Sequence, residues 1–181
     1  MNDEIWKDAS VAQRFLQGVR GGIPFAKEQI EILIRLIEAN GKPLRAFADL
    51  GCGSGVVAAA ILARFPRAQA TLVDFSPPML KQAKAQLQNH GRRVRFVVAD
   101  LGERAWMKAV RARAPFDLIA SGFCIHHQPD KRKRQLYAEI FALLRPGGMF
   151  VNIEHVSSPT QWVEAAGDEL MIDTIHKFHA G

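Results

Sequence analysis

The stretch Asp49-Leu50-Gly51-Cys52-Gly53-Ser54-Gly55 decides the fold of this chain. It follows the apolar run 46–48 and leads directly into the apolar run 56–62. This order predicts a strand, a tight glycine turn and a helix. Glycines permit positive φ and the close approach of a ligand, and the free N–H groups of the following helix face the same place. The turn is therefore predicted to hold a ligand.

Apolar runs and helical patterns alternate on the carboxyl side of this turn. Short strands separated by helices indicate right-handed βαβ units and a mainly parallel sheet. Such sheets bind ligands beyond the carboxyl ends of their strands. The predicted strands span 45–50, 70–74, 94–99, 116–121 and 149–156, and the predicted helices span 56–65, 104–113 and 131–144, with another opened by Ser76-Pro77-Pro78.

Helical patterns also flank the alternating region. One covers residues 3–17, and a second carries Ile30, Leu33 and Ile37, with Pro24 expected in its first turn. A further helical pattern runs from Val163 to Phe178. At 181 residues and 48% hydrophobic content, the chain is expected to form one domain. Its parts are two N-terminal helices over 1–43, an α/β core over 44–158 and a C-terminal helix over 159–181.

The predicted strands end in polar residues. Asp49, Asp74 and Asp100 close the first three apolar runs, Ser121 closes the fourth, and the pair 154–155 (Glu-His) closes the fifth. One such acid is explained by a helix cap. Three acids at successive strand ends instead indicate a ligand site.

The spacing around the turn narrows the ligand. A dinucleotide fingerprint requires a third glycine at position 56, which is Val56. A carboxylate at Asp74 suits the two vicinal hydroxyls of a ribose, and Asp100 suits the exocyclic amine of adenine. The layout therefore fits an adenosine that lacks a pyrophosphate.

From about residue 45 to residue 156, the sequence resembles the class I S-adenosylmethionine-dependent methyltransferases of the small-molecule type. Five motifs in the right order carry the resemblance: Asp49–Gly55, Leu72–Leu80, Val98–Asp100, Phe116–Ile119 and Leu143–Gly148. The resemblance implies a Rossmann-like three-layer sandwich with strand order 3-2-1-4-5, and S-adenosyl-L-methionine as cofactor. It also implies that Arg145-Pro146-Gly147-Gly148 is a structural turn into the fifth strand.

The same resemblance assigns cofactor contacts by position. The glycine turn lines the methionine and ribose portion, Asp74 holds the ribose hydroxyls, and Arg20 is a candidate partner for the carboxylate. The expected cofactor-binding residues are Arg20, Asp49, Gly51, Cys52, Gly53, Gly55, Asp74, Phe75, Met79, Asp100, Leu101, Ser121 and Gly122.

Candidates for proton removal lie in the loop 121–129. Methyl transfer mainly requires alignment of the reacting groups and exclusion of water, and it sometimes requires a base. His126 and His127 are the catalytic candidates, with loop ordering as the alternative role. A nucleophilic role for Cys52 is not expected. The pair 154–155 offers too few ligands for a metal site, so no metal is expected.

Charge leaves a second class of acceptor open. The formal net charge is +6, and much of the excess lies in the clusters 92–95 and 131–134. An RNA methyltransferase is therefore an alternative, although no base-flipping Asn-Pro-Pro-Tyr motif is present, so nucleic acid is the less favoured partner. Two cysteines without a CxxC spacing, an acidic N-terminus and no long apolar run favour a cytoplasmic protein without a membrane segment.

The pattern departs from the family after the fifth predicted strand. The family's sixth and seventh strands are not visible in the sequence, which continues in a helical pattern instead. The edge of the fifth strand is then exposed unless the terminal helix or a second subunit covers it. The alternatives that follow are a truncated form of a longer chain, a homodimer that covers this edge, and a non-catalytic, cofactor-binding partner subunit. A small-molecule methyltransferase remains the leading prediction.

Overall fold

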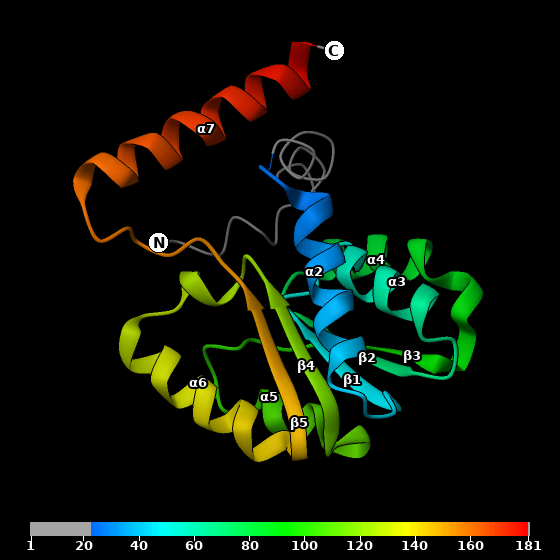
Figure 1. Ribbon diagram of the computed structural model, residues 1–181. Helices are drawn as coiled ribbons and strands as arrows, with labels where there is room; N and C mark the ends of the chain where they lie inside the picture. Colours follow the sequence, from blue (N-terminus) through cyan, green and yellow to red (C-terminus); the bar gives the residue numbers. More distant parts are fainter. Residues whose placement is uncertain (1–22, 181) are drawn as a thin grey trace.

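A sheet of five strands forms the centre of the protein (Figure 1). The computed structural model describes residues 23–180, with side chains up to residue 178. The strand order is β3-β2-β1-β4-β5, and every neighbouring pair is parallel, which confirms the predicted order. Within residues 23–180 no strand follows β5. The strands are β1 (Ala46–Leu50), β2 (Gln69–Asp74), β3 (Val94–Val98), β4 (Phe116–Gly122) and β5 (Leu144–Ile153).

Helices cover both faces of the sheet and complete the three predicted layers. One core cluster packs α2, α3 and α4 on one face, and a second packs α5 and α6 on the other. Because side chains alternate along a strand, Phe47 joins the first cluster while Ala48 and Leu50 join the second. The helices are α2 (Ala26–Ala39), α3 (Val56–Arg64), α4 (Pro77–Gln86), α5 (Trp106–Val110), α6 (Asp130–Leu143) and α7 (Gln161–Ala180), with 3₁₀ turns η3 (Gln88–Arg93), η4 (Arg111–Arg113) and η5 (Ile125–His127).

The structure differs from expectation at the start of α2. The helical pattern at 3–17 lies outside the described residues. α2 begins at Ala26, so Pro24 lies in the turn before the helix and not in its first turn. The reason is Phe25, whose left-handed backbone (φ 57) separates the two. α7 leaves the layers at the carboxyl end of β5 (Figure 1). The division at residues 43 and 158 stays a prediction.

β5 begins earlier than predicted, because the expected turn forms a bulge inside the strand. Leu144 pairs with Phe116 and Met149 pairs with Leu118, so β5 advances from 144 to 149 while β4 advances only from 116 to 118. Gly147 turns the bulge with φ 73. The Nη1 of Arg145 donates a hydrogen bond to the Oδ1 of Asp117 at 2.7 Å, which holds the bulge against β4.

None of the helices within residues 23–180 combines the length and the apolar character needed to span a membrane.

Candidate functional site

The glycine turn between β1 and α3 has the predicted positive φ angles. Gly51, Gly53 and Gly55 have φ values of 65°, 52° and 83°. The N–H groups of Gly51 and Cys52 both donate to the carbonyl of Val73, at 2.8 and 3.0 Å. These bonds fasten the turn to the end of β2. The carboxyl ends of β1 and β2 therefore meet at one place, as the sequence predicts.

Each glycine of the turn meets different surroundings. A Cβ at Gly51 would lie 2.0 Å from the Sγ of Cys124, so a side chain cannot be accommodated there. A Cβ at Gly55 would lie within 3.3 Å of three side chains of the core. At Gly53 a Cβ would meet no atom of residues 23–180 within 4 Å. The backbone at Gly53 is thus the part of the turn that is open to a ligand.

Asp74, at the end of β2, is buried and bonded to the glycine turn. Its Oδ2 accepts from the N–H of Gly53 at 2.8 Å, and its Oδ1 accepts from the N–H of Ser76 at 2.9 Å. Burial raises the pKa of Asp74, and backbone hydrogen bonds from Ser76, Gly53 and Phe75 partly oppose this shift. The carboxylate has about four acceptor sites, so beside these backbone donors it retains capacity for a further donor such as a ribose hydroxyl.

Asp49 and Cys52 support the turn from the buried side. Asp49 is 1% exposed, and its Oδ2 accepts from the N–H of Ala58 in the first turn of α3 at 3.2 Å. This is a helix-capping contact, and a direct role in ligand binding stays a prediction. Burial, followed by the charges of Asp49 and Asp74, raises the pKa of the Cys52 thiol well above its usual value. A neutral thiol at this position is a poor nucleophile.

The end of β3 lies beside Asp74. The N–H of Ala99 donates to the carbonyl of Asp74 at 3.1 Å. Asp100 is exposed, and its Oδ1 accepts from the N–H of Gly102 at 2.7 Å. Leu101 is buried, and its carbonyl accepts from the Nε of Arg132 at 2.7 Å. The loop after β3 is therefore fixed to α6, with one carboxylate at the surface.

The start of α4 supplies the two predicted apolar contacts. Met79 is buried and Phe75 is half-buried. Ser76 caps the helix by accepting from the N–H of Met79 at 3.4 Å, as the Ser-Pro-Pro sequence suggests. Both side chains follow Asp74 directly, at the carboxyl end of β2.

The end of β4 is tied to β1 through Ser121. The Oγ of this buried residue donates to the carbonyl of Leu50 at 2.9 Å. A Cβ at Gly122 would lie 3.8 Å from Val57, which is an ordinary contact distance. The structure thus gives Ser121 a structural bond, and the roles of Ser121 and Gly122 toward a cofactor stay predictions. Arg20 lies outside the described residues.

Glu154, which follows β5, was not among the predicted site residues. Its Oε1 accepts from the N–H groups of Cys124, Ile125 and His126 at 3.0, 2.7 and 3.2 Å. Its Oε2 lies 2.6 Å from the Nδ1 of His126. The sequence held a signal for this pair, because β4 and β5 are neighbours in the predicted order and the residues that follow them must meet.

His126 and His127 lie together in η5, with ring centroids 4.0 Å apart. The side chain of His126 is 34% exposed, while that of Glu154 is 7% exposed. Phe123 precedes them with φ 52, and its N–H donates to the carbonyl of Ile153 at 2.8 Å. A left-handed non-glycine residue costs energy, and here the bond to β5 holds it in place.

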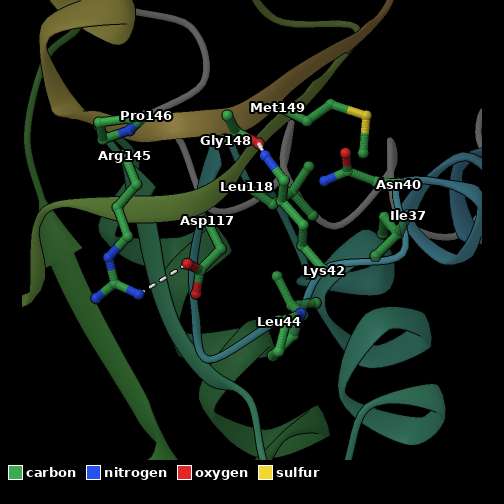
Figure 2. A pocket seen from close by; sticks show the side chains of 12 residues that line it. Ile37, Asn40, Lys42, Leu44, Asp117, Leu118, Arg145, Pro146, Gly148 and Met149 are labelled. Atoms are coloured by element: carbon green, nitrogen blue, oxygen red, sulfur yellow. Dashed lines mark hydrogen bonds and ion pairs between the residues drawn. The ribbon is translucent and has the colours of Figure 1, made fainter.

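A small cavity lies at the opposite end of the sheet (Figure 2). It encloses about 70 Å³ and is bordered by the end of α2, the start of β4 and the bulge of β5. Lys42 and Arg145 extend into this region, and Lys42 Nζ donates to the carbonyl of Gly147 at 3.1 Å. Sites for drug-sized ligands enclose about 300 Å³ or more. This cavity is too small for a nucleoside and is remote from the strand ends that carry the acids.

Two acids and a histidine approach one another where α7 begins. Ligand atoms of His155, Glu164 and Asp168 lie within 4.8 Å of one another. The Oε2 of Glu164 already accepts from the N–H of Ser158 at 2.6 Å, and hydrogen bonds from Ser158 lower the pKa of Glu164. We interpret this group as a contact between α7 and residues 155–158, which precede it.

The arrangement defines a Rossmann-like α/β domain whose glycine turn and acidic residues lie at the carboxyl ends of β1, β2 and β3. Comparison with known proteins agrees. Residues 47–148 match the family described as methyltransferase domain, and the chain belongs to that family.

Relatives of known name are small-molecule methyltransferases. Trans-aconitate 2-methyltransferase of Methylobacterium radiotolerans is 35% identical over 133 residues, which cover 66% of this chain and 46% of the relative. Demethylmenaquinone methyltransferase of Leptospira interrogans is 30% identical over 136 residues, which cover 75% of this chain and 53% of the relative. The chain thus spans about half the length of these relatives.

Solved structures share the fold. An S-adenosylmethionine-dependent methyltransferase from Clostridium acetobutylicum superimposes with a TM-score of 0.63 at 19% identity, covering 79% of this chain and 55% of the other. Human N-acetylserotonin methyltransferase gives a TM-score of 0.65 at 18% identity, covering 93% of this chain and 46% of the other. At these identities the likeness supports the fold alone.

Proposed function

We propose that this chain binds S-adenosyl-L-methionine and transfers its methyl group to a small-molecule acceptor. The observation that carries the proposal is the bond between Asp74 and the N–H of Gly53, which joins a ribose-type carboxylate to an open glycine turn. Relatives named for trans-aconitate and demethylmenaquinone methylation support a small acceptor.

The residues present fit this cofactor. The backbone at Gly53 leaves room for a ligand against the turn, and the remaining acceptor capacity of Asp74 suits a ribose hydroxyl. Phe75 and Met79 offer apolar surface for the adenine, and Asp100 offers an exposed carboxylate at its edge. Arg20 remains our proposed partner for the carboxylate of the methionine portion.

The chemistry asked of the protein is modest. S-adenosyl-L-methionine supplies a methyl group on a sulfonium, which is a good leaving group. The protein binds and orients the two reactants and excludes water. His126 is the proposed proton acceptor, because it lies in the loop after β4 and is held by Glu154. His127, packed against it, is proposed to order the loop.

Calorimetry tests the cofactor proposal directly. We expect the protein to bind S-adenosylmethionine and S-adenosylhomocysteine, while NAD, which carries a pyrophosphate, binds much more weakly. Absence of binding by both adenosyl ligands would overturn the proposal. Tight NAD binding would instead assign the turn to a dinucleotide.

A small acceptor is favoured over RNA because one arginine of each basic cluster, Arg93 and Arg132, is held by contacts within the fold. Arg113 donates to the carbonyls of Ala70, Arg93 and Arg92. Arg93 donates to the carbonyl of Pro66 at 2.8 Å, and Arg132 is buried in an ion pair. Incubation with methyl-labelled cofactor and cell extract tests this preference. We expect label in small molecules, and label confined to RNA would reverse the assignment.

A homodimer across the edge of β5 is proposed as the partner arrangement. β5 is the last strand of the sheet, and its residues are partly exposed, unlike those of β1. An unpaired edge invites pairing with another chain. Light scattering tests this proposal, and a monomer at all concentrations contradicts it. A cytoplasmic location is also proposed, supported by the low number of cysteines, two in the sequence and without a CxxC spacing.

A further inference from the structure

Glu154 and His126 form a pair at the carboxyl end of the sheet, and backbone hydrogen bonds hold the carboxylate in place. Glu154 comes from the end of β5, and the three N–H groups bound by its Oε1 come from the loop after β4. These donors satisfy one oxygen and leave the other for the imidazole, at 2.6 Å. Since the Glu154 side chain is 7% exposed, this contact is largely shielded from water.

The contact determines which nitrogen of His126 carries a proton. An ionised carboxylate only accepts hydrogen bonds, so Nδ1 must donate. In the neutral imidazole, Nε2 then has no proton and is the basic atom. Nε2 lies on the side of the ring away from Glu154, and the His126 side chain is partly exposed. His126 is thus set to receive a proton at Nε2.

We propose that Glu154 is the positioning residue that holds His126 in the Nδ1–H tautomer, and that the acceptor is a neutral hydroxyl or amine that loses its proton on methylation. This inference rests on the proposed function. A carboxylate acceptor is already ionised at neutral pH and needs no base. The built-in base therefore points to a substrate class in which the nucleophile carries a proton.

The step balances. The acceptor oxygen or nitrogen forms a bond to the methyl carbon, and the carbon–sulfur bond breaks with its electron pair on sulfur. The proton of the acceptor moves to Nε2 of His126. The resulting imidazolium is stabilised by Glu154 and later releases its proton to solvent.

Imidazole NMR tests the role of Glu154 without any acceptor. Long-range ¹⁵N–¹H spectra of the folded protein are expected to show His126 as the Nδ1–H tautomer. His90 is an internal reference of the opposite kind, because Nη2 of Arg93 donates to its Nδ1 at 2.7 Å. An Nε2–H tautomer of His126 in the wild-type protein would overturn the proposal, even if no variant folds.

Glu154→Gln is the sharpest variant. Its amide oxygen still accepts from the loop N–H groups, while its NH₂ group donates to Nδ1 and drives His126 to the Nε2–H tautomer. Affinity for S-adenosylhomocysteine is expected to stay near that of the wild type, and turnover to fall by about 100-fold or more. Glu169→Gln, an exposed change on α7, is the matched control. A purely structural Glu154 would leave the tautomer unchanged.

The bond formed in the product tests the acceptor class. Cell extract is incubated with the protein and cofactor carrying a ¹³C-methyl group, and the products are treated with alkali. Ethers and methylamines survive, whereas methyl esters release methanol. We expect alkali-stable O-methyl or N-methyl signals, and ester or C-methyl products would overturn the assignment. Loss of cofactor binding in calorimetry would instead refute the proposed function itself.

Discussion

The Oδ2 of Asp74 accepts a hydrogen bond from the N–H of Gly53 at 2.8 Å, so the end of β2 and the glycine turn form one unit. The two residues are 21 positions apart in the chain. Because the carboxylate also accepts from Ser76, it orders both the turn and the start of α4. Substitution of Asp74 is therefore expected to weaken cofactor binding.

Cofactor affinity is expected to fall as the pH falls through the pKa of Asp74. Burial raises this pKa above the usual aspartate value, and a ribose hydroxyl donates a stronger hydrogen bond to the ionised form than to the protonated form. Affinity is therefore present above the raised pKa and lost below it. Calorimetry with S-adenosylhomocysteine from neutral to mildly acidic pH measures the effect.

Asp74→Asn provides the matched test. We expect an affinity about 10- to 100-fold lower and independent of pH in this range, because the amide cannot accept as the carboxylate does. Asp130→Asn, at a side chain that is 90% exposed, should retain the wild-type pH profile. A wild-type affinity that stays constant while the protein remains folded would refute the role of Asp74.

Substitution of glycines in the turn should separate stability from binding. Gly51→Ala places a Cβ 2.0 Å from the Sγ of Cys124 at a φ of 65°, so we expect a loss of about 2–4 kcal/mol. Gly53→Ala meets only the backbone cost of about 1–2 kcal/mol, because its Cβ enters open space.

The same open space at Gly53 is where the cofactor should lie. Gly53→Ala is thus expected to weaken S-adenosylhomocysteine binding. Its unfolding temperature is expected to fall less than that of Gly51→Ala. Thermal unfolding and calorimetry on both variants decide the matter. An affinity of Gly53→Ala for S-adenosylhomocysteine equal to that of the wild type would contradict the proposed position of the cofactor.

Local motifs explain why the glycine turn, the position of Asp74 and the start of α4 could be predicted from the sequence. The glycine turn and the Ser-Pro-Pro helix start depend on residues adjacent in sequence, and Asp74 follows directly from the end of an apolar run. The start of α2 was predicted wrongly, since nothing in the sequence signals the left-handed Phe25. The turn at 145–148 was recognised, but its position inside β5 was not.

The acceptor half required knowledge of which strand ends are neighbours. Glu154 and His126 are 28 residues apart, and neither belongs to a recognised short motif. Asp117 likewise appeared only as part of a family motif. In the structure it accepts from the N–H groups of Arg45 and Ala46, which lie 72 and 71 positions away. Long-range hydrogen bonds of this kind depend on sheet register. Hydrophobic periodicity predicts which face of the sheet a side chain lies on, but not which residue of the neighbouring strand it pairs with.

The buried ion pair between Arg132 and Glu139 should be important for stability. Its Nη2–Oε2 distance is 2.6 Å, and the Nε1 of Trp106 also donates to Glu139 at 2.8 Å. Burial alone would raise the pKa of Glu139, but hydrogen bonds from Arg132 and Trp106 and the charges of Arg132 and Arg104 lower it overall. The pair's contribution is therefore present above the unfolded-state pKa and lost as the pH falls through the lower folded-state pKa.

Removing Arg132 leaves the buried carboxylate of Glu139 with Trp106 and the exposed Arg104 as its partners. Arg132→Met is expected to lower the free energy of unfolding by about 3–5 kcal/mol. Arg132→Met combined with Glu139→Leu should recover much of this loss and reduce the acid sensitivity. Denaturant unfolding at neutral and acidic pH measures both effects. A double variant no more stable than the single one would indicate that Arg132 acts mainly through the carbonyl of Leu101.

Asp117 should affect stability without affecting the cofactor. Its Oδ2 accepts from the N–H groups of Arg45 and Ala46 at 2.8 Å each, and its Oδ1 binds Arg145, so Asp117→Ala leaves three donors without their acceptor. We expect a loss of about 1–3 kcal/mol in the free energy of unfolding. Because these contacts lie at the amino end of β1, affinity for S-adenosylhomocysteine should remain unchanged. Chemical denaturation and calorimetry on the folded variant test the two halves of the prediction. A large loss of affinity in a stable Asp117→Ala protein would mean that the bulge of β5 influences the opposite end of the sheet.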